Sequence, residues 1–340
     1  MRAAVLRSPA PVDSKPLQIE ELPMPVPAAN EVLLKVLACG VCHTDLHIVE
    51  GELPPRLPWI IPGHQIVAEI VDPRGSSLNE SARVGVSRVG ISRVGVSWVG
   101  GTDGTCSFCQ SGRENLCDHP TYTGYTHQGG YAEYTTARAD FLSVLPEELS
   151  NNDAAPLLCA GIIGFRSVRV AEVKPGQRVG LFGFGASAQL IIQVLLAWDC
   201  KVYVSTREPQ HQQLARSLGA EWVGGGTDVP PVALDCAVTF APVGEVVIAA
   251  LRSLAKGGIL AINAIHLDRI PEFDYDSLLW GERQIRSVSN MTRQDGRDFL
   301  KIAAEIGLKP TVTTYPLERA NQALQTIRHN KFTNPAVIVP

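Results

Sequence analysis

The sequence has little net charge and no long block of either sign. Its 340 residues include 30 Lys and Arg against 34 Asp and Glu, which gives a formal net charge of −4. We therefore expect no nucleic acid and no acidic membrane surface as a partner, since both need a large field of one sign. Disorder is excluded as well, because 45% of the residues are hydrophobic and only 19% are charged.

The sequence also lacks an apolar run that could cross a bilayer. Runs such as "LIIQVLLAW" fall short of the ~20 residues that a spanning helix needs. The first residues, "MRAAVLRSPAPVDS", are too rich in proline and charge for a signal peptide. We therefore expect a cytoplasmic protein without membrane contact. In a reducing compartment its eight cysteines indicate metal binding, catalysis or burial rather than disulfides.

Two patterns divide the chain, whose length is typical of about two domains. Residues 1–150 form short strand-like runs separated by loops rich in Gly and Pro, which predicts a β-rich domain. From residue 151 strands and helices alternate, which predicts a doubly wound parallel sheet and an α/β fold class. The expected segments there are strands at 178–184 and 201–206 and helices at 186–198 and 208–219.

A short repeat precedes Trp98: "RVGVS", "RVGIS" and "RVGVS" fill residues 83–97. Side chains of a strand alternate with a period of two, so a period of five places successive copies on opposite faces. We expect one copy to form the native strand and the others to form an extension or a loop. No catalytic role is assigned to the repeat.

A candidate phosphate-binding turn lies between a predicted strand and a predicted helix. In "GFGASA", Gly183, Gly185 and Ala188 form a G-x-G-x-x-A pattern. Glycine permits a tight turn against a pyrophosphate, and the helix N-terminus offers unpaired N–H groups. In this context the motif predicts dinucleotide binding, although small residues also serve ordinary helix–strand packing.

The end of the second strand of this region suggests which dinucleotide binds. An acidic residue that binds the adenosine ribose is expected there, but the sequence has Ser205, Thr206 and Arg207. Two hydroxyls followed by Arg suit a 2′-phosphate, so NADP(H) is favoured over NAD(H). The alternatives are a solvated surface Arg and a ribose contact from Glu208, one position further.

Two groups of cysteines have the composition of metal sites. "CGVCHTDLH" at 39–47, with His64 and Cys159, offers two thiolates and an imidazole, a set that leaves zinc one open position. The pattern does not select Cys42 over Cys39. In "DGTCSFCQSGRENLC", Cys106, Cys109 and Cys117 have the spacing of a zinc-binding lobe, with Asp103 where a fourth cysteine is expected. In both groups the alternative is a set of buried thiols. For Asp103 the further alternative is a turn cap beside an empty or water-completed site.

Together these motifs resemble the zinc-dependent medium-chain alcohol dehydrogenases. "GVCHTDLH", "PGH", the three-cysteine lobe, "LLCAG" and "GFGASA" occur in that family's order over nearly the whole chain. The resemblance implies a GroES-like catalytic domain at 1–150, completed by 291–340, and a Rossmann NAD(P)-binding domain at 151–290. It also implies a homo-dimer or homo-tetramer.

The resemblance assigns a role to each site residue. It implies that Cys42, His64 and Cys159 bind the catalytic zinc, which lowers the pKa of a bound alcohol before hydride transfer to the nicotinamide. Thr44 would accept the substrate proton and pass it through the cofactor ribose to His47. The remaining implied roles are a hydrogen bond from His64 to Asp45, a cofactor phosphate contact by His43, a pocket wall at Trp98, and a structural zinc held by Asp103, Cys106, Cys109 and Cys117. Helix capping is the alternative for Thr44 and Asp45, and core packing for Trp98.

Two residues depart from the family pattern. Gln65 follows His64 where many relatives carry Glu, and Asn334 stands near the position of an Arg that contacts cofactor phosphate. We expect a zinc-dependent dehydrogenase acting on small primary or secondary alcohols or aldehydes. The alternatives are a zinc-free, NADPH-dependent enone or quinone reductase on the same scaffold and a cofactor-binding protein without turnover.

Overall fold

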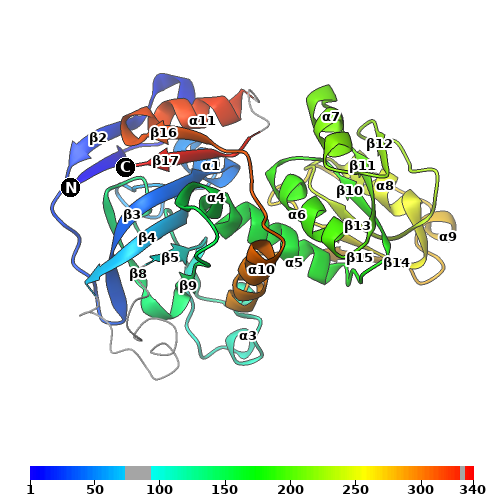
Figure 1. Cartoon of the computed structure of the whole chain (residues 1–340), viewed down its shortest axis with the longest axis horizontal. Coiled ribbons are helices and arrows are strands. Elements are labelled where there is room, and N and C mark those ends of the chain that lie inside the picture. Colours follow the sequence, from blue (N-terminus) through cyan, green and yellow to red (C-terminus); the bar gives the residue numbers. More distant parts are fainter. Residues whose placement is uncertain (73–92, 330–333) are drawn as a thin grey trace. The chain divides into compact units, whose positions relative to one another are not determined.

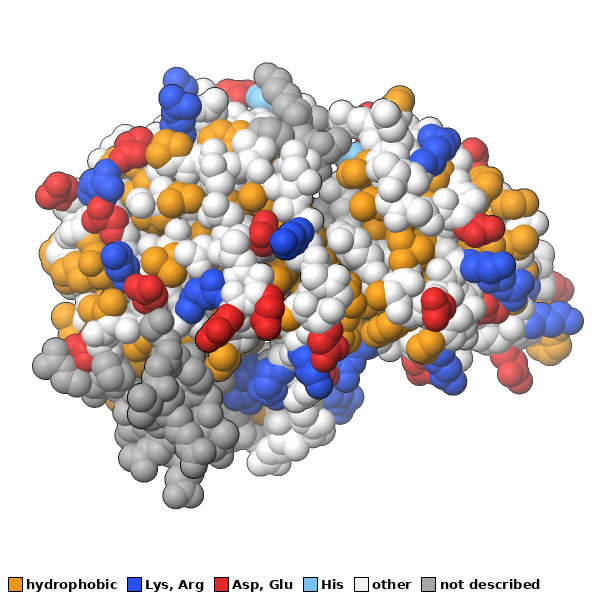
Figure 2. Space-filling model, in the orientation of Figure 1, with side chains coloured by type: hydrophobic (Ala, Val, Ile, Leu, Met, Phe, Trp, Pro, Cys, Tyr) orange, Lys and Arg blue, Asp and Glu red, His pale blue; other side chains and the backbone are white. Residues whose placement is uncertain are grey.

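The computed structural model describes residues 1–72, 93–329 and 334–340. The chain divides into two compact units, residues 1–159 with 290–340 and residues 160–289 (Figure 1). In the described part of the chain, no helix combines the length and the apolar character needed to span a membrane. On the face drawn in Figure 2, acidic and basic side chains are interspersed, in keeping with the small net charge.

The first unit is built on a seven-stranded sheet with the order β16-β17-β3-β4-β5-β9, in which β8 also pairs with β3. Its long central strand alternates between the core and the surface, as expected for a strand with one buried face. The strands of this sheet are β3 (Glu31–Val41), β4 (Gln65–Asp72), β5 (Arg93–Val96), β8 (Tyr134–Arg138), β9 (Ser143–Val144), β16 (Thr313–Pro316) and β17 (Ala336–Val339). The two-stranded sheets are β1 (Arg2–Leu6) with β2 (Leu17–Glu21) and β6 (Val99–Gly101) with β7 (Thr121–Tyr122).

Short helices join these strands and return the C-terminal segment to the sheet. They are α1 (His43–Glu50), α3 (Ser107–Gln110), α4 (Asn151–Pro156), α10 (Arg293–Glu305) and α11 (Ala320–Arg328). Helix α10 begins directly after Thr292, which forms a reciprocal capping box with Asp295.

The predicted repeat strand is confirmed for one copy. Strand β5 takes up the third copy, and the Cβ of any residue other than glycine at Gly95 would lie 2.4 Å from a methyl carbon of Leu158. The first two copies, at 83–92, lie outside the described residues. Trp98 follows the strand directly, which brings the repeat to the aromatic residues described below.

The second unit confirms the predicted doubly wound sheet. Its six strands are all parallel and lie in the order β12-β11-β10-β13-β14-β15. From β10 the strand order runs toward one edge of the sheet, and from β13 it runs toward the other, so the strand order reverses between these two strands. The strands are β10 (Arg178–Phe182), β11 (Lys201–Ser205), β12 (Trp222–Gly224), β13 (Leu234–Thr239), β14 (Leu254–Ile262) and β15 (Gln284–Ser287). The helices are α5 (Ile162–Val170), α6 (Ala186–Ala197), α7 (Pro209–Ser217), α8 (Gly244–Ser253) and α9 (Tyr275–Leu278).

The strand order explains where the helices of this unit lie. Connections between parallel strands are right-handed, and α6 leads from β10 toward one edge while α8 leads from β13 toward the other. The two helices therefore cover opposite faces of the sheet, and α5 packs with α6 (Figure 1). Ligands of such sheets bind beyond the carboxyl ends of the strands at the point of reversal, which is where β10 and β13 lie side by side.

Candidate functional site

Three ligand atoms converge in the first unit. Cys42 Sγ, a ring nitrogen of His64 and Cys159 Sγ all lie within 4.8 Å of one another, and Cys42 Sγ is 3.3 Å from His64 Nε2. Cys39 is outside this group: it is fully buried and points toward Gly63 and Gly130. The structure thus brings together the residues that the resemblance implied and separates Cys39 from them.

Local backbone features place each of the three residues. Cys42 follows the last residue of β3 and is the N-cap of α1, and its sulfur accepts from the Thr44 N–H at 3.3 Å. His64 follows Gly63, whose φ of +97° and contact with the ring of Tyr131 leave no room for a Cβ. Cys159 lies in a π-helix that begins directly after Pro156, which has no N–H to continue the helical ladder.

Asp45 accepts hydrogen bonds from two of these residues, His64 and Cys42. Its Oδ1 accepts hydrogen bonds from His64 Nδ1 at 3.0 Å and from Gly63 N at 3.2 Å, and its Oδ2 accepts from Cys42 N at 2.9 Å. The carboxylate is fully buried, and the bond to Cys42 N closes the capping box of α1. Asp45 therefore makes both of the expected contacts at once: the hydrogen bond to His64 and the cap of helix α1.

The electrostatics of the cluster favour a bound cation. The Cys159 thiol donates a hydrogen bond to the Cys42 sulfur, so the two sulfurs share one proton. This bond lowers the pKa of Cys42 well below the ordinary value of a cysteine and raises the pKa of Cys159 well above that value. Burial lowers the pKa of His64, but the charges of Asp45 and Cys42 outweigh it and raise the pKa. A divalent cation would replace these protons, and two sulfurs with one imidazole form a set that suits zinc.

An aromatic stack flanks the cluster. Trp98 contacts the His64 ring edge-on, with centroids 5.1 Å apart. Its other neighbours are Tyr122, stacked at 4.8 Å, and Tyr125, stacked at 6.0 Å. Trp98 is half-buried, so the stack forms an apolar wall beside the three ligand atoms.

Helix α1 also carries the two residues predicted to move a proton. Thr44 is buried in its first turn, and His47 lies one turn further, where side chains at i and i+3 are neighbours. His47 Nδ1 makes a short contact with Glu52 Oε2. His43, on the same helix, is exposed to solvent.

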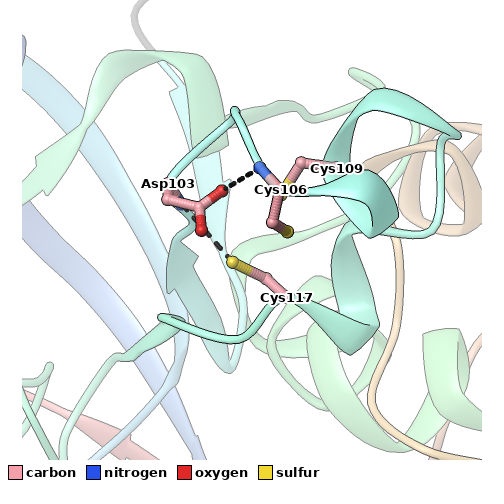
Figure 3. Close-up of side chains that lie close together, drawn as sticks. All are labelled: Asp103, Cys106, Cys109 and Cys117. Carbon is pink, nitrogen blue, oxygen red and sulfur yellow. Dashed lines mark hydrogen bonds between the residues drawn. The ribbon is translucent and has the colours of Figure 1, made fainter.

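A second group of ligand atoms lies in the lobe at 103–117. One carboxylate oxygen of Asp103 and the sulfurs of Cys106, Cys109 and Cys117 lie within 4.8 Å of one another, and all four side chains point to a common centre (Figure 3). Asp103 Oδ1 accepts from the N–H groups of Cys106 at 3.0 Å and Thr105 at 2.9 Å. These two bonds lower the pKa of Asp103. The carboxylate therefore stays ionised and has a fixed orientation, as a metal ligand requires.

The phosphate-binding turn lies in the second unit, where β10 passes into α6. Gly183 has a φ of +90° and approaches Ala241 N so closely that a Cβ would lie 2.9 Å from it. Gly185 is the N-cap of α6, and a Cβ there would meet no atom within 4 Å. The first turn of α6 thus has no capping side chain, and its N-terminal N–H groups are available for an anion. Ala188 is fully buried in α6.

Known proteins match the chain over its whole length. Residues 28–147 match the family model described as the alcohol dehydrogenase GroES-like domain. A protein named probable alcohol dehydrogenase AdhA, from Mycobacterium tuberculosis, is 45% identical, with 100% of this chain and 97% of the relative covered. The chain belongs to the zinc-type medium-chain alcohol dehydrogenase family.

Two further comparisons agree with this assignment. An alcohol dehydrogenase from Geobacillus stearothermophilus is 32% identical, with 99% of each chain covered. The solved structure of a cobalt- and zinc-bound alcohol dehydrogenase from Pyrobaculum aerophilum superposes with a TM-score of 0.85 at 22% identity, over 100% of this chain and 99% of that one. The predicted α/β fold with a GroES-like domain and a doubly wound sheet is thus confirmed, and the protein is an alcohol dehydrogenase.

In this alcohol dehydrogenase the three residues at the carboxyl end of β11, Ser205, Thr206 and Arg207, differ in exposure. The buried Ser205 hydroxyl donates to the carbonyl of Asp228 at 2.8 Å, so its proton is engaged inside the unit. Thr206 is also buried, whereas Arg207 is exposed and pairs with Glu208 at 3.0 Å. Of these residues, Arg207 and Glu208 present charge to solvent.

Several site residues have neighbours that no sequence pattern indicated. Tyr122 and Tyr125 stack on Trp98, and Glu52 contacts His47, although no periodic pattern links these positions. The aromatic pair in "TYTGYT" is the one signal that could have pointed to the stack. Gln65 is buried at the start of β4 and packs against Gly40.

Proposed function

We propose that this alcohol dehydrogenase depends on zinc and that Cys42, His64 and Cys159 hold the catalytic ion. The convergence of their ligand atoms within 4.8 Å is the observation that carries the proposal. Zinc held there would have one open position, where it would polarise an alcohol oxygen and lower the pKa of the hydroxyl. The Pyrobaculum structure, solved with cobalt and zinc, has the same fold.

The chain's own residues orient the site and move the proton. Asp45 accepts from His64 Nδ1 and thereby fixes the tautomer in which Nε2 offers its lone pair. Thr44 Oγ1 takes up the alcohol proton, and His47, one turn along α1, delivers it to solvent. The contact of Glu52 with His47 Nδ1 assigns Nε2 the role of proton acceptor. Trp98 narrows the approach, which favours small or slender alcohols and aldehydes.

The unit formed by residues 160–289 would hold a nicotinamide dinucleotide, which would supply the hydride acceptor. Gly183, Gly185 and the first turn of α6 hold the pyrophosphate, and His43 contacts a cofactor phosphate. The exposed Arg207 supports NADP(H) over NAD(H), because a guanidinium suits a 2′-phosphate. Ser205 and Thr206 shape this end of β11 from inside the unit.

The lobe at 103–117 holds a second, structural zinc. Three thiolates and a carboxylate complete a tetrahedral set, and Asp103 already points toward the three sulfurs (Figure 3). By the same family resemblance, the protein assembles as a homo-dimer or homo-tetramer.

Metal analysis tests the proposal. The purified protein should contain two zinc ions per chain and oxidise a panel of small alcohols faster with NADP than with NAD. Cys42→Ser should lose one zinc and the activity, whereas Cys200→Ser, which changes a buried cysteine outside both clusters, should keep both. A zinc-free protein that still oxidised alcohols, or unchanged zinc content in Cys42→Ser, would contradict the proposal.

A further inference from the structure

A pocket of about 170 Å³ lies in the first unit, lined by the chain after β1 and by residues 55–60. Leu6 and Ile60 join its two walls through reciprocal backbone hydrogen bonds of 2.8 and 3.0 Å. Because both walls are fixed by backbone, the pocket is preformed. It is smaller than the ~300–1,000 Å³ of sites for drug-sized ligands, so its size suits a ligand of about one ring.

The lining carries positive charge without a carboxylate. Arg7 and Arg56 both line the pocket, and no Asp or Glu does. Arg7 is already engaged: it forms a two-pronged pair with Glu20 and lies over the Trp59 ring at 5.5 Å. Arg56 has no carboxylate partner in the described ranges of the chain.

The guanidinium of Arg56 is nevertheless held in place. Its Nε donates to the Tyr125 hydroxyl at 3.2 Å, and that hydroxyl donates to the Pro54 carbonyl at 2.8 Å. This contact uses one edge of the guanidinium and leaves the two terminal nitrogens for a partner. A planar fork of this kind matches a carboxylate, which can accept both bonds at once.

Apart from the Ser8 side chain, the rest of the lining is apolar and aromatic. Trp59, Ile60 and Tyr125 present ring and aliphatic surface next to the two cations. A bare inorganic anion would leave this surface unused, whereas a ring that bears a carboxylate would contact both parts. We propose that this pocket binds a small aromatic carboxylate, with its carboxylate on Arg56 and its ring against Trp59 and Tyr125.

The pocket is separate from the three-ligand cluster but close to its aromatic wall. None of Cys42, His64 and Cys159 lines it, while Tyr125, which does, stacks on Trp98. The proposal is therefore independent of the zinc assignment. It identifies a second small-molecule site in the enzyme, one that reaches the back of the Trp98 stack.

Calorimetric titration of the purified enzyme with sodium benzoate tests the proposal. Benzamide has the same ring without the charge, so it loses the charge-assisted hydrogen bonds. Inorganic phosphate has charge without a ring, so it loses the ring contact. Both compounds should bind at least about tenfold more weakly than benzoate. Arg56→Gln should weaken benzoate binding by a similar factor. Arg56→Lys keeps the charge but not the fork, and should give an intermediate affinity.

Two controls separate this pocket from other sources of binding. Lys301→Gln removes one positive charge from α10, which contributes nothing to the pocket, and should leave benzoate binding unchanged. Cys42→Ser disables the proposed catalytic cluster and should also leave it unchanged. Equal benzoate affinity in Arg56→Gln and wild type, or loss of binding in Cys42→Ser, would overturn the proposal.

Discussion

Asp45→Asn is the sharpest test of how the catalytic cluster is held. The fully buried carboxylate accepts three hydrogen bonds, from His64 Nδ1, Gly63 N and Cys42 N. An asparagine has one acceptor oxygen. If that oxygen stays with His64 and Gly63, the NH₂ group faces the N–H of Cys42, and the bond that caps α1 is replaced by two opposed donors.

The magnitude follows from this loss. A hydrogen bond to a charged group contributes about 1.5–3 kcal/mol, and here at least one is lost together with the negative charge beside His64. Converted at 1.4 kcal/mol per tenfold change, this is a decrease in zinc affinity of about 10- to 100-fold, the range found when outer partners of metal-ligating histidines are replaced. Competition with a chromogenic chelator measures the affinity, and alcohol oxidation under zinc-limited conditions should decrease in parallel.

Asp295→Asn is the matched control. Asp295 is also a buried capping-box aspartate, on α10, and it accepts from the N–H of Thr292 at 2.9 Å. Its substitution should lower the free energy of unfolding without changing zinc affinity. The reasoning would be refuted if Asp45→Asn retained wild-type zinc affinity, or if Asp295→Asn lost as much.

Three other predictions concern the lobe, the cofactor and the pH dependence of stability. Asp103→Cys should slow zinc release from the lobe to a chelator and Asp103→Ala should speed it, because thiolate suits a closed zinc site better than a hard oxygen; equal release rates would argue against ligation. Arg207→Gln should lower the preference for NADP over NAD about tenfold, measured as the ratio of kcat/KM values, while Arg216→Gln on α7 should not. Arg178 lowers the pKa of Asp235 from 3.8, so the stabilisation by this pair is present above that pH and is lost as the pH falls through the lower folded value. Because the pair is partly exposed, Asp235→Asn should cost about 0.5–1 kcal/mol at pH 7, and the difference should shrink in acid unfolding experiments below pH 3.8.

The doubly wound unit could be predicted closely because its signals are local. The apolar run of α6, the Gly turn before it and Gly219 after α7 each depend on neighbours in the sequence. The capping box of α10, formed by Thr292 and Asp295, was not predicted from the sequence pattern. The inward direction of the Ser205 hydroxyl could not be predicted either, because it depends on a hydrogen bond to the carbonyl of Asp228 in a distant loop.

The choice between Cys39 and Cys42 shows why the site needed a structure. Both residues belong to one motif, and each is a plausible ligand by type. Cys39 lies within β3 between two paired strands, opposite Ile66 and Ile338, so its sulfur has no way out of the core. Cys42 comes just past the end of β3, where the chain turns into α1. Strand register decided the question, and register depends on residues far away in the sequence.

The two clusters differ in how far their local structure depends on a bound metal. This difference explains why the lobe tolerates an aspartate at its fourth ligand position. At the buried cluster, two sulfurs share one proton and an imidazole is held by an anion, so any change of ligand leaves an unbalanced charge in the core. The lobe has its own supports: the buried Glu114 accepts from Arg293 N at 3.0 Å, and Asn290 Nδ2 donates to the carbonyl of Asn115 at 3.2 Å.

These bonds anchor the lobe to the first residue of α10 and to the segment before it, whatever ion the lobe holds. Asp103 is partly exposed, so its charge is in contact with solvent with or without a partner. A thiolate-to-carboxylate exchange at that position therefore changes how tightly the lobe holds its ion, while leaving the fold that carries the active site in place.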